Sequence, residues 1–330
     1  MPAVHRINKP SALNYRYLGA AARQTLTVAA NQDISGHGLE VGQHAAEPTL
    51  GDIRHVHAGG LSGNIIVGKV STRAQCIRVL GATSTRCMPT TEWLNKYEAI
   101  KNKLTCKDDL EAHFTEKVIG NMAVDVLDIG TVHFPTGTIF ACDPMVELED
   151  TQPFIQTIPA GTYPVKLCVV PSEKYGDRYA CVKVEISGEK PVRYELGMTG
   201  KEDLDEELGE DEYFGFGVDA GMGCVADIQT QAAFKTYWAK RLEEDPDIDP
   251  YNDLFCDLLE ENAKAHPKYQ GDCGEWLNWT VPDTDCKLPI FASGWGDGYY
   301  PVYFGYDAKG EVRAVYVLFL DIEDSYKEQA

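Results

Sequence analysis

The chain has 330 residues, 44% of them hydrophobic, which is enough apolar material for one large domain or two of ordinary size. Thirty Lys and Arg against 51 Asp and Glu give a net charge of −21, which disfavours nucleic acid and anionic membranes as partners. There is no run of 18 apolar residues and no apolar segment of the secretory kind after Met1, so neither a transmembrane helix nor a secretory signal is predicted.

The first part of the chain differs in composition from the rest. Residues 1–90 hold 9 basic and 4 acidic residues (9 − 4 = +5), and the remaining 240 hold 21 and 47 (21 − 47 = −26). Of the 33 aromatic residues, only Tyr15 and Tyr17 lie in the first 90. Burial of large side chains offsets chain entropy, and this segment has few of them. We therefore expect residues 1–87 to be largely disordered and residues 88–330 to form a single globular domain.

Two explanations account for such an N-terminal extension. Residues 1–32 contain four basic residues and no acidic residue, a composition typical of an organellar transit peptide. Alternatively, translation begins at Met88 and the upstream part is spurious. The second explanation is favoured because the change in composition falls at a methionine.

Two helices are predicted at the start of the domain. Trp93, Tyr97, Ile100 and Leu104 follow a helical spacing after a Thr-Thr-Glu start, so one apolar face is expected there. A second short helix is expected from Asp108 or Asp109 to Lys117.

Strands and turns are predicted from Val124 to Leu196. Pro159–Gly161 and Pro171–Asp177 separate successive runs of strand-forming residues. In 179–186, apolar residues alternate with Cys181, Lys183 and Glu185, which predicts a strand with one dry face.

The second half combines an acidic loop, two helices and a meander. Residues 201–212 carry eight acids in twelve positions, which indicates an exposed loop. One helix is expected around Phe234–Leu242, and a second one begins with Asp249 as its N-cap and Pro250 in its first turn. From Leu288 onward, turns at Asp297-Gly298 and Asp307–Gly310 predict hairpins, and the apolar run 312–320 predicts a central strand. The fold class is therefore α+β, with a mostly antiparallel, β-rich core (a sandwich or barrel-like meander) and three or four helices.

The cysteines indicate the compartment. None of the ten forms a C-x-x-C pair, and Cys142, Cys168, Cys181 and Cys224 lie inside apolar runs. Such cysteines are usually buried thiols in a reducing compartment, so we expect a cytoplasmic protein.

Common nucleotide and zinc motifs give little signal. Two glycine-rich strings, at 215–220 and 221–226, lack the acidic residue that ends the next strand of a dinucleotide fold. The three histidines after Met88 are scattered, without paired cysteines, so no cofactor is identified.

Carboxylates form the more plausible catalytic set. Asp143, Asp219, Asp227 and Asp297 follow strand-like runs or lie in glycine-rich turns, where acids could hold a divalent cation of unknown identity or act as general bases. Ordinary turn chemistry explains the same residues.

At these residues the sequence resembles a family catalogued as domain of unknown function 4241. The resemblance covers about residues 125–325 and marks Asp143, Arg178, Asp219, Asp227, Ser293 and Asp297 as characteristic polar positions. It implies no reaction. The matching segments are 134–144, 159–165, 178–180, 218–223 with Asp227, and 293–298 with Tyr300.

Two functions are predicted from these observations. The first is a cytoplasmic binding protein with an acidic surface that contacts a basic protein or a small-molecule ligand through Ser293, Trp295, Tyr299 and Tyr300. The alternative is a metal-assisted or acid–base hydrolase that uses the four aspartates, with Arg178 stabilising an anion. Whether the chain is an enzyme is left open.

Overall fold

The computed structural model describes residues 88–205, 208–209 and 212–327, together with three strands nearer the N-terminus. These strands belong to a unit of their own. They form an antiparallel sheet in the order β1-β2-β3, with β1 at Ile53–Ala58, β2 at Leu61–Ile66 and β3 at Arg78–Leu80. Apart from these three strands, residues 1–87 lie outside the described residues, so their predicted disorder stays a prediction.

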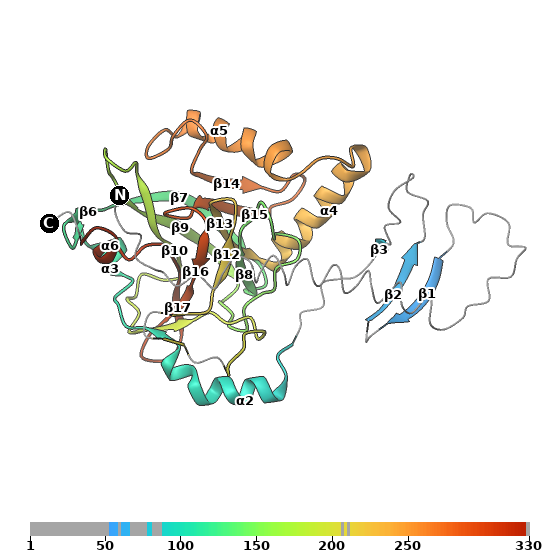
Figure 1. Ribbon diagram of the computed structural model, residues 1–330, viewed down its shortest axis with the longest axis horizontal. Coiled ribbons are helices and arrows are strands. Elements are labelled where there is room, and N and C mark those ends of the chain that lie inside the picture. The colour runs from blue at the N-terminus through green and yellow to red at the C-terminus, as the bar shows by residue number, and fades with distance from the viewer. Residues whose placement is uncertain are drawn as a thin grey trace, which may run out of the picture. The chain divides into compact units, whose positions relative to one another are not determined.

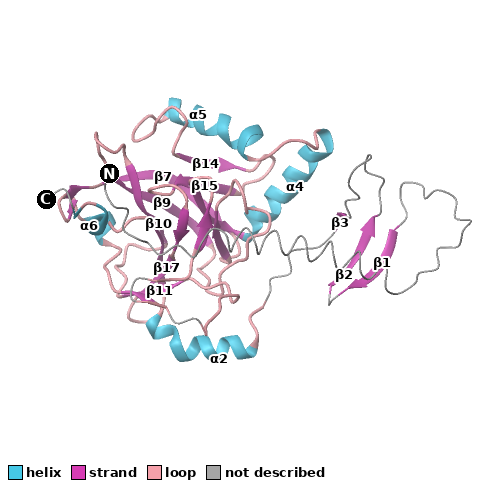
Figure 2. Cartoon of the chain, in the orientation of Figure 1, coloured by secondary structure: helices cyan, strands magenta, loops and turns pink. Residues whose placement is uncertain are grey.

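The unit that contains the described residues from Met88 onward is built on a seven-stranded antiparallel sheet (Figures 1 and 2). Its strand order is β4-β11-β17-β18-β10-β9-β7. The strands are β4 (Thr105–Cys106), β7 (Asp125–Phe134), β9 (Gly161–Val170), β10 (Arg178–Glu185), β11 (Arg193–Leu196), β17 (Val302–Tyr306) and β18 (Val312–Leu318).

A four-stranded antiparallel sheet in the order β14-β15-β13-β8 packs against the first sheet. Two strand pairs complete the unit, β12 with β16 and β5 with β6. The bounds are β5 (Val118–Ile119), β6 (Met122–Ala123), β8 (Ile139–Cys142), β12 (Phe216–Val218), β13 (Met222–Asp227), β14 (Trp276–Thr280), β15 (Lys287–Ala292) and β16 (Gly298–Tyr300).

Helices cover the outer side of the four-stranded sheet. Figure 1 shows α4 and α5 beside β14 and β15, and the side chains of both helices share a buried apolar cluster with that sheet. No described helix is long and apolar enough to cross a membrane. The helices are α2 (Thr91–Ile100), a 3-10 turn at Lys101–Lys103, α3 (Ala112–Thr115), α4 (Ile228–Glu244), a π-helical turn at Tyr251–Phe255, α5 (Cys256–Ala265) and α6 (Ile322–Ser325).

Each strand of the four-stranded sheet separates two apolar cores. Phe291 of β15 lies in the core between the two sheets, and its neighbour Ile290 lies in the core under α4 and α5. This alternation follows from the period of two in a strand. The α+β, β-rich fold class is confirmed, and the described sheets form no closed barrel.

Several predicted elements are present with small changes. Thr90 caps α2 by accepting a hydrogen bond from the Trp93 N–H, and Tyr97 is the buried residue of this helix. The second predicted helix is reduced to Ala112–Thr115. Asp249 accepts the Asn252 N–H, as expected of a cap, but a π-helical turn precedes the regular helix.

The strand predicted to have one dry face is instead buried on both faces. It is β10, an inner strand of the seven-stranded sheet, and Cys181 and Lys183 are as buried as the apolar residues beside them. Lys183 is accommodated because its ammonium group binds Glu111 Oε1 at 2.6 Å and Glu185 Oε2 at 3.0 Å. The phenol of Tyr316 donates to the other oxygen of Glu111.

The predicted hairpin at Asp297-Gly298 is wrong. β15 before this turn pairs with β13 and β14, whereas β16 after it pairs with β12, so the turn carries the chain from one sheet to another. The turn at Asp307–Gly310 does connect the paired strands β17 and β18, and β18 lies between β17 and β10, as expected of a central strand.

Candidate functional site

Two loops that carry predicted site residues meet beside β16. One loop follows β12, and the other follows β15. The Ser293 N–H donates to the Gly221 carbonyl at 3.0 Å across this junction. The β12–β16 register ends with Val218 paired to Gly298, and Asp219 and Asp297 are the residues next in sequence to this pair. Both aspartates are exposed.

The buried side chains of Ser293 and Tyr300 stabilise the second loop through hydrogen bonds to its backbone. The Ser293 hydroxyl donates to the Gly296 carbonyl at 2.8 Å, and the Tyr300 phenol lies 2.7 Å from the same oxygen. Both side chains are buried. Tyr299 is half-buried in β16, opposite Gly217. Of the four predicted binding residues, only Trp295 is exposed, and Gly296 next to it has φ +96°, a conformation that favours glycine.

Asp143 connects β8 to the first loop. Its Oδ2 accepts the N–H groups of Asp219 at 3.0 Å and Ala220 at 2.7 Å, and its Oδ1 accepts that of Met145 at 3.0 Å. Burial raises the pKa of Asp143, and these three hydrogen bonds oppose the rise. The observed role of this carboxylate is to hold the backbone of the loop.

Asp227 has a similar role at a different place. It is fully buried and caps α4 through the Gln229 N–H at 2.9 Å. Its Oδ2 also accepts the N–H groups of Thr136 and Gly137, both at 2.9 Å, and the Thr136 hydroxyl binds the same carboxylate. Asp227 therefore joins the start of α4 to the turn between β7 and β8.

The structure does not gather the four predicted aspartates into a metal centre. Within residues 88–205, 208–209 and 212–327, no group of three or more His, Cys, Asp or Glu side chains could hold a metal ion. Asp143 accepts the backbone N–H of Asp219, while Asp227 accepts that of Thr136 in the turn between β7 and β8.

Arg178 and Trp295 come together although β10 and the second loop are far apart in sequence. The guanidinium carbon of Arg178 lies 4.8 Å from the centroid of the Trp295 ring, a cation–π contact. Tyr175 meets the same ring edge-on at 6.4 Å, and Tyr326 lies 6.1 Å from it. We call these four residues the Trp295 surface. Tyr175 and Tyr326 are also 6.3 Å from each other.

Tyr175 and Tyr326 were not predicted from the sequence as site residues. Tyr175 lies in the loop between β9 and β10, and Tyr326 follows α6 near the C-terminus. Tyr175 could have been singled out as the aromatic residue inside the predicted turn 171–177, because turns usually consist of small and polar residues. Nothing in the sequence near Tyr326 indicates its contact with Trp295.

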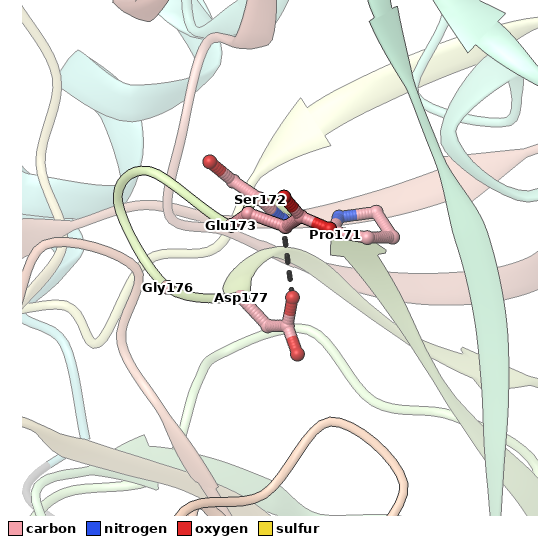
Figure 3. Close-up of a pocket in the computed structure, with 5 residues that line it drawn as sticks. All are labelled: Pro171, Ser172, Glu173, Gly176 and Asp177. Atoms are coloured by element: carbon pink, nitrogen blue, oxygen red, sulfur yellow. Dashed lines mark hydrogen bonds between the residues drawn. The ribbon is translucent and has the colours of Figure 1, made fainter.

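An open depression of about 390 Å³ lies in the same β9–β10 loop. Figure 3 shows the Asp177 carboxylate facing the backbone of Ser172, whose N–H it accepts at 3.1 Å. A second depression of about 520 Å³ lies along β4 and β11 and includes none of the predicted site residues. The lining of the first is Pro171, Ser172, Glu173, Gly176 and Asp177.

Comparison with known proteins gives one match. The family model described as "Protein of unknown function (DUF4241)" matches residues 132–317, which is more than half of the chain. This range includes every predicted site residue. No curated protein matches the chain significantly, and neither does any solved structure.

Proposed function

This chain belongs to the DUF4241 family, whose description assigns no activity, and we propose from the structure that it is a cytoplasmic binding protein. Its contact site is the Trp295 surface together with the exposed aspartates 219 and 297. The partner is a basic protein or peptide. The half-exposed, rigidly supported indole of Trp295 is the observation that carries the proposal.

Trp295 differs from the other four tryptophans in its exposure. It is 46% exposed, while the others are buried or half-buried. Its ring is held by Arg178 and by two tyrosines, so little conformational freedom remains to be lost when a partner covers it. Large aromatic side chains of this kind dominate binding energy at protein interfaces.

The charges around Trp295 favour a basic partner. Asp297 is two residues from Trp295, and Asp219 and Asp297 adjoin the last residue pair of the β12–β16 ladder, Val218 and Gly298. Residues 91–330 carry 21 basic and 47 acidic residues, so the field of the whole domain attracts cations. Such a field raises the association rate of a basic partner and weakens as salt is added.

The hydrolase remains the alternative, with less support. Asp143 and Asp227 are each engaged by three backbone N–H groups, an arrangement that satisfies their oxygens without a substrate. The cytoplasmic location is supported by the eight described cysteines, which are free thiols.

A peptide titration tests the proposal. A fluorescent peptide of about ten Lys and Arg residues should bind the full chain, with an affinity that falls as salt rises, while a polyglutamate peptide should not bind. Trp295→Ala should weaken binding at least roughly tenfold, as expected of a central aromatic contact. Tyr251→Ala, which removes an exposed aromatic ring from another element (43% exposed), is the matched control and should change little.

Equal affinity of the wild-type protein and Trp295→Ala for the basic peptide would overturn the proposed site. Binding of the acidic peptide in place of the basic one would overturn the proposed class of partner.

A further inference from the structure

We infer that the inner side of the Trp295 surface is a binding site for a small oxyanion, a carboxylate or a phosphate group, held by Arg178 and Tyr326. This site goes beyond the proposed contact with a basic partner, because its ligand has the opposite charge. It is carried by two side chains that pack on one indole ring and whose buried donor atoms, Arg178 Nε and Tyr326 Oη, have no hydrogen-bond acceptor among the described residues.

The first donor is Arg178. Its Nε is buried without a hydrogen-bond partner, and within the described part of the chain no carboxylate lies within ion-pair distance of its guanidinium. A guanidinium has only donors, and burying one without an acceptor costs free energy. In a chain with 51 acidic residues, a partly buried arginine without an ion pair is a reason to look for an external anion.

Two acids near Arg178, its sequence neighbour Asp177 and Glu275, accept hydrogen bonds from the backbone of their own loops. Glu275 is near enough that the charge of Arg178 lowers its pKa, although burial, the larger effect, raises it. The Glu275 carboxylate accepts the Gly271 N–H at 2.6 Å, and Asp177 accepts the Ser172 N–H at 3.1 Å (Figure 3). Each of these carboxylates therefore closes its own loop.

The second donor is the phenol of Tyr326. This residue is 1% exposed, and its hydroxyl has no hydrogen-bond partner among the described residues. Burial raises the pKa of Tyr326, and the charge of Arg178 opposes this rise. Both also pack on Trp295, at 4.8 Å for the guanidinium carbon and 6.1 Å for the tyrosine ring.

The chemistry of these donors defines the ligand. An arginine Nε–H and a tyrosine O–H match the oxygens of a carboxylate or a phosphate, and hydrogen bonds to a charged oxygen are the stronger kind. Neither donor suits a cation. The indole of Trp295 covers the guanidinium on one side and limits its hydration, which strengthens its attraction for an anion.

The test compares two anions on the full chain at constant ionic strength, with sodium chloride as the reference salt. Sodium phosphate, sodium acetate or both should raise the melting temperature by roughly 2–5 °C at about ten times the dissociation constant. Phosphate alone would assign a phosphate ligand, and acetate alone a carboxylate. Calorimetric titration gives the affinities.

Three variants locate the site. Tyr326→Phe removes only the hydroxyl and should weaken binding of the anion at least tenfold. Arg178→Gln should weaken the anion by at least as much. Lys240→Gln removes an exposed positive charge on α4 and should have no effect.

The inference would be overturned if neither anion stabilised the wild-type protein beyond sodium chloride, or if both bound equally well to Arg178→Gln and Tyr326→Phe. Basic-peptide binding that depends on Trp295, without any anion binding, would support the proposed function and reject this site.

Discussion

Replacement of Asp227 by asparagine tests whether the buried aspartates hold the fold or await a substrate. Asp227 is fully buried and accepts hydrogen bonds from Thr136 N, Gly137 N, Gln229 N and the Thr136 hydroxyl. Asparagine keeps one acceptor oxygen. If that oxygen faces Thr136 and Gly137, the amide group faces the Gln229 N–H, and the cap of α4 is lost.

The magnitude follows from these contacts. Loss of an N-cap costs about 0.5–2 kcal/mol. Two hydrogen bonds to a charged oxygen become hydrogen bonds to a neutral one, which costs about 1 kcal/mol each. We therefore expect Asp227→Asn to lower the free energy of unfolding by roughly 2–4 kcal/mol.

Urea unfolding followed by circular dichroism measures this change. Asp219→Asn is the control, because Asp219 is exposed and its replacement should change the free energy of unfolding by no more than about 0.5 kcal/mol. A catalytic carboxylate often costs stability, and its removal then leaves stability unchanged or raises it. An Asp227→Asn protein as stable as the wild type would refute our interpretation and favour the hydrolase.

Three further predictions follow from buried or paired groups. Lys183→Met should lower the free energy of unfolding by about 3–5 kcal/mol, because it leaves the buried Glu111 carboxylate without an opposite charge, and Lys183→Met with Glu111→Leu should recover most of this loss in the same urea assay. The pKa of Asp125 is lowered to about 2, chiefly by a hydrogen bond from Lys268. The contribution of Asp125 to stability is therefore present above the unfolded pKa of 3.8 and is lost as the pH falls toward 2. The difference in the free energy of unfolding between wild type and Asp125→Asn should disappear over that range of an acid titration. Cys142 and Cys224 face each other at 3.6 Å and are both buried, so mass spectrometry after brief alkylation should find both unmodified in the native protein and modified in urea.

The sequence predicted local structure better than strand pairing. The start of α2 was predictable because the cap at Thr90 and the apolar spacing that follows act within a few residues. The turn at Asp297-Gly298 was predictable as a turn, but its partner strands were not. β16 pairs with β12, about eighty residues earlier, and no local signal specifies that pairing.

The burial of a charged side chain also could not be predicted from the sequence. Lys183 looked like a solvent-facing residue because alternation normally separates a dry face from a wet one. In the folded chain, Glu111 from the start of α3 reaches over β10 and pairs with it. The position of that carboxylate is a property of the tertiary structure.

The candidate residues were found from sequence, but their grouping was not. Arg178 was predicted with the catalytic set and Trp295 with the binding set, whereas the structure places them 4.8 Å apart. Asp143 was predicted as a catalyst, and its hydrogen bonds show it holding the backbone at residues 219 and 220. Such roles depend on which backbone donors surround a carboxylate, and those come from distant segments.

The most direct test of the account is the NMR signal of the Trp295 indole N–H, assigned with Trp295→Phe and followed while a Lys–Arg peptide or phosphate is added. We predict that this signal shifts with either ligand while those of the four remaining tryptophans stay in place. A Trp295 signal that does not move when the peptide or the anion binds would contradict the assignment of this surface as the binding site.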